Sequence, residues 1–494
     1  MTRSCYTVSQ AQHQTAPGAE RRAPRSARSE RLDWVRSFRK RVASDVDTLC
    51  GLVEADTGKA RFETVTTDLM PLLASCRWHE RHARRLLALK RATGGAWWLL
   101  GQSQRVTRAP LGTVGIIATW NYPLQLLGVQ LVQALVAGNT VIVKPSEHAP
   151  RSQRRLLELA AADLPDGVLT WTDATREAGA ELLDRNRSGE IHLDHLVFTG
   201  STEVGRTIAE TVGGTLTTST LELSGRDSAL VLGDADPSLA ARSIWHAVTL
   251  NSGQTCMAPR RALIDRAAYP EFVRALSRPV AGSGTAQLIM PEAATHAFKL
   301  AADAVRDGGR SLSGVLESPQ GAKMRPVAVV DCPPNAELVT GAHFGPVLAV
   351  IPCDGLDEML AIHRACDQHL ATSVYTRDKR RARELAPLLG SGSVTVNDTI
   401  IPTAHPGVSI HGHGRSGWGM SQGVEGLLAL TRAVTVSSTN TVLRIPVGPP
   451  AHQAAQWMPK VARTAYGGAR SPNQIEHTPT PARPATTEGT AHGH

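Results

Sequence analysis

The chain has 494 residues, which is longer than one ordinary domain and long enough to bury a large core in two or three lobes. With 41% hydrophobic and 20% charged residues it has the balance of a globular protein, and no run of about 18 or more apolar residues suggests a membrane span. The net charge is +9, but residues 1–29 carry five Arg against one Glu, and residues 441–494 carry five basic against two acidic residues. No basic stripe interleaved with aromatic residues runs through the body, so the composition favours solvated tails over nucleic-acid binding.

The ends of the chain differ in composition from its middle. We expect residues 1–29 to form a disordered basic leader; their Arg and Ser content faintly resembles an organelle transit peptide, which is the less favoured interpretation. The folded body runs from residue 30 to about 440, and the extension 441–494 is expected to be largely disordered after about residue 467. The cysteines show no CxxC pair or zinc spacing, which predicts free thiols and a cytoplasmic location; they are at positions 5, 50, 76, 256, 332, 353 and 366.

The first part of the body predicts a parallel sheet. Helices are expected over 32–53 and 70–89, and the stretch 97–117 could pair as a hairpin. Strands and helices then alternate: strands at 113–118, 140–144, 168–171, 193–198, 217–223 and 229–232, with helices at 124–137, 151–162, 177–184 and 203–212. This alternation is typical of a doubly wound α/β sheet, which binds its ligands at the carboxyl ends of the strands.

A second α/β pattern spans roughly residues 257–435. Its expected strands are 348–351, 372–375 and 393–396, and its expected helix is 380–389. Two α/β lobes with a cleft between them suit an enzyme that acts on a small molecule beside a nucleotide.

Three segments at predicted strand ends or turns carry complementary chemistry. They are Trp120–Pro123, Leu221–Gly225 and Asn251–Cys256. A cysteine thiolate attacks carbonyl groups, the resulting oxyanion needs donors such as an amide, and a later hydrolysis needs a carboxylate that activates water. Cys256, Asn121 and Glu222 would supply these three groups. Taken singly, each also has an ordinary explanation: a small core thiol, a turn former and a solvated acid.

Residues 412–417 spell GxGxxG, but the setting is wrong for a dinucleotide fingerprint. No strand clearly feeds the motif, no obvious helix follows, and an acid about 20 residues on is missing. A loop is the preferred interpretation. The nearby His405, His411 and His413 lack ligand spacing, so no metal site is expected.

In its motifs and their order, the sequence resembles the aldehyde dehydrogenase superfamily. The 34-residue spacing between Glu222 and Cys256 matches the usual spacing in that family. The resemblance covers about residues 30–440 and is strongest from 106 to 261. The matching segments are 108–115, Trp120-Asn121-Tyr122-Pro123, Lys144-Pro145-Ser146-Glu147, 198–205, Glu222, Cys256, 344–347, 373–378, 392–397 and 416–419.

The resemblance implies a mechanism and a role for each matching residue. Cys256 is the nucleophile, the Asn121 side chain and the Cys256 N–H form the oxyanion hole, and Glu222 is the base for thioester hydrolysis. The cofactor is implied to be NAD, with NADP as the alternative, because Glu147 should repel a 2′-phosphate. The implied cofactor-binding residues are Trp120, Lys144, Ser146, Glu147, Gly200, Ser201, Thr202, Gly205, Leu223 and Phe344.

The resemblance also implies an architecture of two Rossmann-type α/β lobes and a small β arm. The cofactor domain would comprise 30–96 and 110–223, the catalytic domain 224–427, and an oligomerisation arm 97–109 and 428–440. Such proteins usually pair through this arm, so we expect a homodimer or homotetramer that acts on a small-molecule aldehyde, with no nucleic-acid or membrane partner.

Four departures from the family pattern keep a second hypothesis open. Ala342 stands where the family has a Glu that grips the nicotinamide ribose, Ser224 and Arg226 replace a Gly and a Lys, and residues 409–412 read Ser-Ile-His-Gly. The segment between Cys256 and Phe344 is also shorter than usual. The alternative function is therefore a degenerate, non-catalytic member of the family that serves as a binding or scaffold protein.

Overall fold

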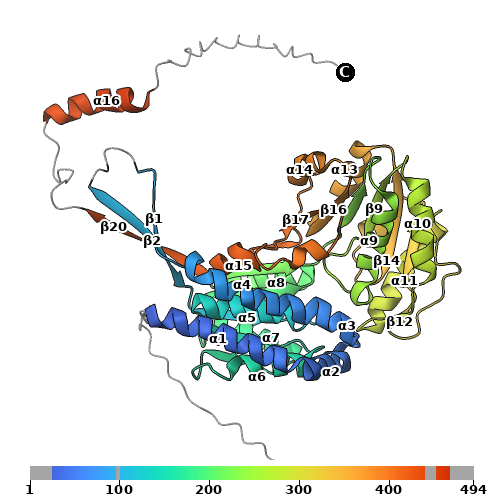
Figure 1. The fold of residues 1–494 in the computed structure, drawn as a ribbon, viewed down its shortest axis with the longest axis horizontal. Helices are drawn as coiled ribbons and strands as arrows, with labels where there is room; N and C mark the ends of the chain where they lie inside the picture. The colour runs from blue at the N-terminus through green and yellow to red at the C-terminus, as the bar shows by residue number, and fades with distance from the viewer. Residues whose placement is uncertain (1–24, 96–98, 100, 440–451, 468–494) are drawn as a thin grey trace, which may run out of the picture. The chain divides into compact units, whose positions relative to one another are not determined.

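The computed structural model describes residues 25–95, 99, 101–439 and 452–467 (Figure 1). These residues form two compact units: the larger holds 25–92 and 104–436, and the smaller holds the described parts of 93–103 and 437–494. The smaller unit contains the helix α16, His452–Tyr466. None of the helices described is both long and apolar enough to cross a membrane.

The larger unit consists of two α/β lobes, of which the first carries the alternating pattern of residues 113–223. Its sheet has the strand order β19-β7-β6-β3-β4-β5. All neighbouring strands are parallel except β19, which runs antiparallel to β7. The strands are β3 Thr113–Ile117, β4 Thr140–Lys144, β5 Leu169–Trp171, β6 His195–Gly200, β7 Thr218–Leu223 and β19 Gly417–Trp418. The predicted doubly wound sheet is confirmed.

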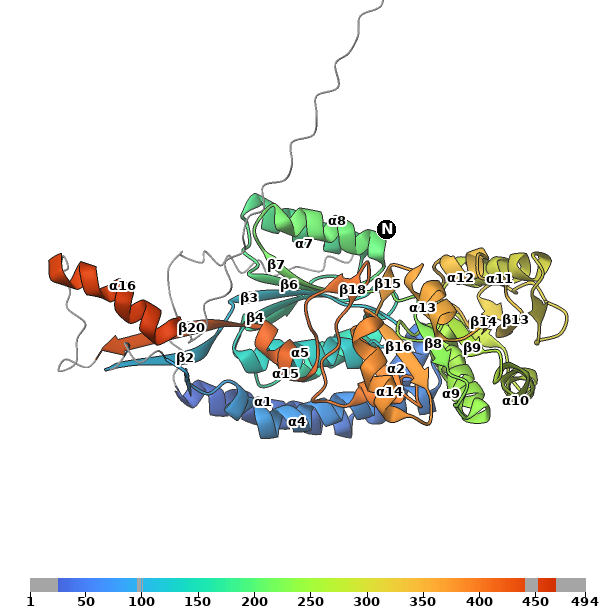
Figure 2. The ribbon, with the colours of Figure 1, turned by 90° about the horizontal axis from the view of Figure 1, so that it is seen from above.

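Helices cover both faces of this sheet (Figure 2). Helices α7 and α8 lie on one face, and α1, α4 and α5 lie on the other. Helix α5 is buried along nearly all of its length, as its apolar sequence predicts, and it ends at Gly138, whose φ of 100° suits glycine. The helices are α1 Arg25–Ser44, α2 Val46–Thr57, α4 Met70–Leu86, α5 Gln125–Ala137, α6 Pro150–Ala161, α7 Arg176–Ser188 and α8 Thr202–Gly213.

The second lobe has its own sheet, in the order β11-β13-β14-β9-β8-β16-β17. Only β11 is antiparallel to its neighbour. The strands are β8 Ser228–Val231, β9 Arg261–Asp265, β11 Arg310–Ser311, β13 Val327–Val330, β14 Val347–Cys353, β16 Ala371–Tyr375 and β17 Ser393–Val396. The central strands are buried on both faces, as expected for a parallel sheet between two helical layers.

Two separate apolar clusters fill the two sides of this second sheet. Helices α9 Pro237–Thr249 and α10 Tyr269–Ala281 pack on one side, and α11 Pro291–Arg306 and α13 Leu356–Arg364 pack on the other. The remaining elements of the larger unit are short: α3 Arg61–Glu63, η1 Thr64–Leu69, η3 Leu250–Gly253, β10 Ala286–Gln287, β12 Lys323–Met324, α12 Glu337–Thr340, β15 Gln368–His369, α14 Lys379–Leu385, η4 Ala386–Leu388, η5 Ile401–Ala404, β18 His413–Gly414 and α15 Gly423–Ala429.

The structure differs from the sequence-based expectation near the N-terminus. Helix α1 begins at Arg25, inside the segment 1–29 expected as a disordered leader; residues 1–24 of that segment lie outside the described residues. The single helix expected over 32–53 is two helices, because the chain leaves helical geometry at Asp45, whose ψ is 16°.

The hairpin expected within 97–117 does not form in the described part of that stretch. Strand β2, Gln102–Pro110, pairs instead with β1, Lys90–Arg91, and with β20, Thr431–Thr439, in a three-stranded sheet. Gly112, with φ of 143°, separates β2 from β3 and redirects the chain into the first lobe. Residues 96–98 and 100 of the expected arm lie outside the description.

The chain returns to the first lobe after completing the second. Strand β19 lies at the edge of the first sheet, and the Gln133 side chain on α5 donates to the carbonyl of Gly423 at the start of α15. Residues 417–427, expected in the catalytic domain, are thus built onto the cofactor lobe. The GxGxxG motif at 412–417 contributes only the short strands β18 and β19, with no helix directly after it.

Candidate active site

Cys256 lies on a tight loop between the two lobes' sheets. The loop follows η3, where Asn251 and Ser252 have φ of 53° and 55° and Gly253 has φ of 79°. A Cβ on Gly253 would lie 2.3 Å from the backbone nitrogen of Pro346, so only glycine fits there. The sequence Asn251-Ser252-Gly253 therefore sets the path that brings Cys256 to the pocket.

The side chain of Arg260 stabilises this loop through hydrogen bonds. Its guanidinium donates to the carbonyls of Gly253 and Thr255 and to that of Gly345, each at 2.9 Å. These three bonds offset part of the cost of burying the guanidinium, whose Nε has no hydrogen-bond partner, and they tie the Cys256 loop to the loop that carries Phe344. Sequence reasoning missed this role, because an Arg four residues after a cysteine has no distinctive pattern.

Asn121 is held against the Cys256 loop. Its side-chain Nδ2 donates to the Gln254 carbonyl at 3.1 Å, and its Oδ1 accepts from Thr119 at 3.2 Å. An amide nitrogen carries two hydrogens, so one N–H remains for an acceptor in the pocket. The Asn121 carbonyl accepts from Asn251 Nδ2 at 2.8 Å, which adds a second link between the two segments.

A buried ion pair supports the segment that carries Asn121. Lys59 Nζ lies 2.7 Å from both Asp68 Oδ2 and the Asn121 carbonyl, and 4.1 Å from the Tyr122 ring centroid. Asp68 Oδ1 accepts from the backbone N–H groups of Leu124 and Gln125 at 3.1 and 3.2 Å. Sequence reasoning missed this pair too, since a Lys and an Asp nine residues apart resemble ordinary solvated charges.

Glu222 is buried at the end of β7. Its carboxylate accepts from Thr199 Oγ1 at 3.2 Å and from the hydroxyl of Ser421. Burial raises the pKa of this carboxyl group to about 7, and the hydrogen bond from Thr199 opposes the shift only in part. A carboxyl group with this pKa can both release and accept a proton near neutral pH.

Cys256 is a neutral thiol in this arrangement. Burial, followed by the nearby carboxyl groups of Glu222 and Asp227, raises the pKa of the thiol to about 12, although Arg260 acts in the opposite direction. The sulfur is therefore protonated until a base or a new positive charge reaches it.

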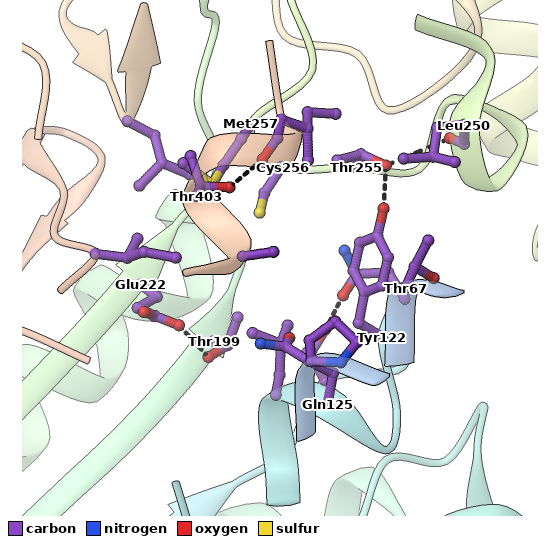
Figure 3. A pocket seen from close by; sticks show the side chains of 18 of the residues that line it. Thr67, Tyr122, Gln125, Thr199, Glu222, Leu250, Thr255, Cys256, Met257 and Thr403 are labelled. Atoms are coloured by element: carbon purple, nitrogen blue, oxygen red, sulfur yellow. Dashed lines mark hydrogen bonds between the residues drawn. The ribbon is translucent and has the colours of Figure 1, made fainter. Parts of the chain in front are cut away.

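These groups line one pocket of about 710 Å³ (Figure 3). The Cys256 side chain and Glu222 both face it, and the dashed lines mark the bonds from Tyr122 to Thr255 and from Thr199 to Glu222. Eight of the residues singled out in the sequence line this pocket: Cys256, Glu222, Asn121, Trp120, Gly200, Ser201, Leu223 and Phe344. The Trp120 and Phe344 rings meet edge to face, with centroids 5.8 Å apart.

The other predicted cofactor residues lie outside the pocket lining: Lys144, Ser146, Glu147, Thr202 and Gly205. Gly205 packs α8 onto β7, because a Cβ there would lie 2.4 Å from Leu223 Cδ2. The Thr202 hydroxyl donates to the Arg415 carbonyl at 3.0 Å. The N-terminus of α8 thus sits directly at the carboxyl end of β6, with Ser201 as its cap, which is the geometry that accepts a pyrophosphate.

Lys144 and Glu147 form an ion pair at 2.8 Å, and Arg176 adds a second bond to Glu147 at 3.0 Å. Burial acts to raise the pKa of Glu147, but the hydrogen bonds from Lys144 and Arg176 outweigh it and hold the pKa at about 2. Glu147 is therefore an anion at any physiological pH, and it can accept from ribose hydroxyls.

Position 342, where the resemblance implies a Glu, is occupied by alanine. The Ala342 carbonyl accepts from His296 Nε2 at 2.9 Å. Among the described residues that line the pocket, the carboxylates are Glu63 and Glu222. The described part of the chain also contains no cluster of His, Cys, Asp or Glu that could hold a metal ion.

A family model described as "Aldehyde dehydrogenase family" matches residues 6–436, which is most of the chain. The chain belongs to the aldehyde dehydrogenase family. This aldehyde dehydrogenase is 29% identical to the "4,4'-diapolycopene aldehyde oxidase" of a Methylomonas species, over 82% of this chain and 77% of the relative. It is 29% identical to the "NADP/NAD-dependent aldehyde dehydrogenase PuuC" of Escherichia coli K12, over 82% and 85%.

Solved structures agree with this assignment. The crystal structure of a Mycobacterium tuberculosis aldehyde dehydrogenase complexed with NAD+ matches with a TM-score of 0.76 and 27% identity. The match covers 86% of this chain and 87% of that one. The two-lobed α/β architecture expected from the sequence is thus confirmed as the aldehyde dehydrogenase fold.

Proposed function

We propose that this aldehyde dehydrogenase oxidises an aldehyde to a carboxylic acid through covalent intermediates on Cys256. The observation that carries the proposal is the convergence of Cys256, Asn121 and Glu222 on one pocket that also reaches the N-terminal end of α8. Each of these groups alone has an ordinary explanation, whereas a nucleophile, an amide donor and a carboxyl group with a pKa near 7 in one pocket suit acyl chemistry.

In the first step the Cys256 thiol loses its proton to solvent and the sulfur adds to the aldehyde carbon. The carbonyl oxygen becomes an oxyanion, which accepts from the free N–H of the Asn121 side chain and from the Cys256 backbone. A bound nicotinamide would supply the acceptor for the hydride of this carbon, whose loss would convert the thiohemiacetal into a thioester on Cys256. Trp120, Gly200, Ser201 and Phe344 would hold the nicotinamide half of the cofactor, and Lys144, Ser146 and Glu147 the adenosine half.

In the second step water hydrolyses the thioester. Glu222 takes a proton from the water, the hydroxyl adds to the acyl carbon, and the bond from carbon to Sγ breaks. The carboxylic acid leaves, and Glu222 passes the proton it took from water to the Cys256 sulfur.

NAD is the cofactor that the site fits best, with NADP as the alternative. Glu147 is anionic and would repel a 2′-phosphate, but the adjacent Arg176 guanidinium would attract one. The relatives agree with either choice: one structure contains NAD+, and the name of PuuC includes both cofactors.

The test is cofactor reduction with a panel of aldehydes. Purified protein should increase the absorbance of the reduced nicotinamide, and Cys256→Ala should abolish the increase. Cys366→Ala is the matched control, since that thiol is buried away from the pocket and its loss should leave the rate unchanged. An inactive wild type that still binds NAD by calorimetry would instead support the degenerate, non-catalytic alternative.

We also propose a homodimer or homotetramer that resides in the cytoplasm. Strand β20 is the edge of its three-stranded sheet, and an edge strand offers unpaired backbone groups to a second copy. The six cysteines in the described ranges are all free, which suits a reducing compartment. Light scattering that compares the molecular mass of the wild type with that of Val436→Pro, in β20, tests the assembly.

A further inference from the structure

The active-site pocket is lined by many apolar side chains and by few groups that can carry charge. Among the described residues that line it, none is Lys or Arg, two are carboxylic acids, Glu63 and Glu222, and one is a histidine, His246. Glu63 Oε1 accepts from the backbone N–H of Asn251 at 3.2 Å, which fixes this carboxylate near the start of the Cys256 loop. A substrate that brings its own negative charge into the pocket would be repelled by these carboxylates and would find neither a lysine nor an arginine to pair with.

Apolar side chains surround the nucleophile itself. Cys256 packs against a cluster formed by Met257, Leu370, Ala371 and Ile410. Next to this cluster the pocket is lined by Leu250 from η3 and Leu126 from α5. A hydrocarbon part of a substrate would therefore contact carbon atoms from the reacting carbon outward.

Two large apolar side chains are exposed at the rim of the pocket. Phe62 in α3 is 78% exposed and Ile401 in η5 is 66% exposed, although both line the pocket. Exposed side chains of this size lose contact with water when an apolar ligand covers them, which favours binding in proportion to the area covered. The two come from opposite lobes, since α3 belongs to the helical layer of the first lobe and η5 follows β17 of the second.

We propose that the preferred substrates are neutral, apolar aldehydes with an extended hydrocarbon part, and that aldehydes with a second, anionic group are poor substrates. The proposal rests on the proposed function and names the substrate class of the same site. The pocket's volume of about 710 Å³ is in the usual range for small-molecule sites.

The test compares two series of straight-chain aldehydes of equal length, one ending in a methyl group and one in a carboxylate. In the neutral series kcat/KM should rise roughly threefold for each added methylene until the pocket is filled. Each anionic aldehyde should be at least tenfold poorer than its neutral partner. Equal or better turnover of the anionic series would overturn the proposal, whereas no turnover of any aldehyde would overturn the proposed function instead.

Two variants locate the cause of the selectivity. Glu63→Gln keeps an oxygen that can accept from Asn251 but removes the charge, so it should raise kcat/KM for anionic aldehydes severalfold relative to kcat/KM for neutral aldehydes of equal length. Ile401→Lys places a cation at the rim and should act in the same direction. Leu388→Lys is the control, because Leu388 is 53% exposed but lies outside the pocket lining. A preference that neither pocket variant alters would show that selectivity arises elsewhere and would contradict the proposal.

Discussion

At the scale of single residues, the carboxyl group of Glu222 and the thiol of Cys256 lose their protons at different pH values. Burial raises the pKa of the Glu222 carboxyl group to about 7, and burial together with the nearby carboxyl groups raises the pKa of the Cys256 thiol to about 12. The second half-reaction should therefore depend on pH through Glu222. Below about pH 7 Glu222 is protonated and cannot take a proton from water; above it the carboxylate is available.

We expect Glu222→Gln to trap the thioester. Hydride transfer should still produce a burst of reduced cofactor about equal to the enzyme concentration, after which turnover falls by roughly 10²–10⁴-fold. In the wild type the hydrolysis rate should rise with pH through about 7, and in the variant this rise should disappear. Rapid-mixing kinetics across pH measures both. A variant that retains the wild-type steady-state rate would exclude Glu222 as the base.

At the same scale, Gly205 should control how closely α8 approaches β7. Gly205→Ala places a methyl group against Leu223 and should destabilise the protein by about 1–3 kcal/mol, while weakening cofactor binding at the N-terminus of α8. Gly213→Ala is a matched control at the other end of the same helix, where a Cβ would meet nothing within 4 Å. Denaturant unfolding and calorimetry with NAD should show a deficit in the first variant alone.

At the scale of elements, the Lys59–Asp68 pair joins η1 to the start of α5 and to the Asn121 segment. Lys59→Met leaves a buried, uncompensated carboxylate and should cost about 3–5 kcal/mol of unfolding free energy. It should also lower kcat, because the Asn121 carbonyl loses a donor. Arg61→Met, which removes an exposed partner of Asp47, should leave the unfolding midpoint in place.

The elements predicted best from sequence are those whose burial produces a clear pattern. The strands β3, β4, β6 and β7 follow apolar runs bounded by turn residues, and each lies within two residues of its expected bounds. Strand β19 could not be found in this way, since Gly417-Trp418 is too short to show alternation and its partner lies far back in the chain. The hairpin prediction was wrong because the backbone changes direction at Gly112, so that β2 pairs with β1 and β20 and not with β3.

In the candidate site, too, some residues could be predicted from the sequence and others could not. The motifs around Asn121, Glu222 and Cys256 could be singled out because their chemistry is unusual in combination. The groups that position them, Lys59 and Arg260, could not, since only tertiary packing makes an ordinary charged side chain a buried one.

At the scale of the whole molecule, buried histidines should make the fold sensitive to acid. Burial lowers the pKa of His79, His195 and His363 to about 4. A histidine whose folded pKa is below its unfolded value contributes stability that is present above about pH 6.5 and lost as the pH falls toward 4, about 3 kcal/mol for each group. Burial raises the pKa values of Glu222 and Asp227 to about 7. These two groups therefore contribute more stability as the pH falls through a similar range, which opposes the effect of the histidines.

Comparison of variants isolates the histidine contribution. Between pH 6.5 and 4 the free energy of unfolding of His79→Leu should fall less than that of the wild type, by about the contribution of one histidine, since the titrating group is gone. His79 Nε2 has no hydrogen-bond partner in the core, so the substitution breaks no bond at that atom. His192→Leu is the control, since that side chain is 80% exposed. Thermal unfolding over this range measures both, and an unchanged slope in His79→Leu would contradict the prediction.

The late return of the chain to the first sheet has a consequence for biosynthesis. Trp418 donates to Ser219, 199 residues earlier, and β19 covers the edge of β7, the strand that carries Glu222. A growing polypeptide must therefore emerge from the ribosome as far as residue 418 before that edge is covered. Until then β7 is an open template for aggregation, so ribosome-bound or prematurely terminated chains should depend on chaperones far more than the finished enzyme does.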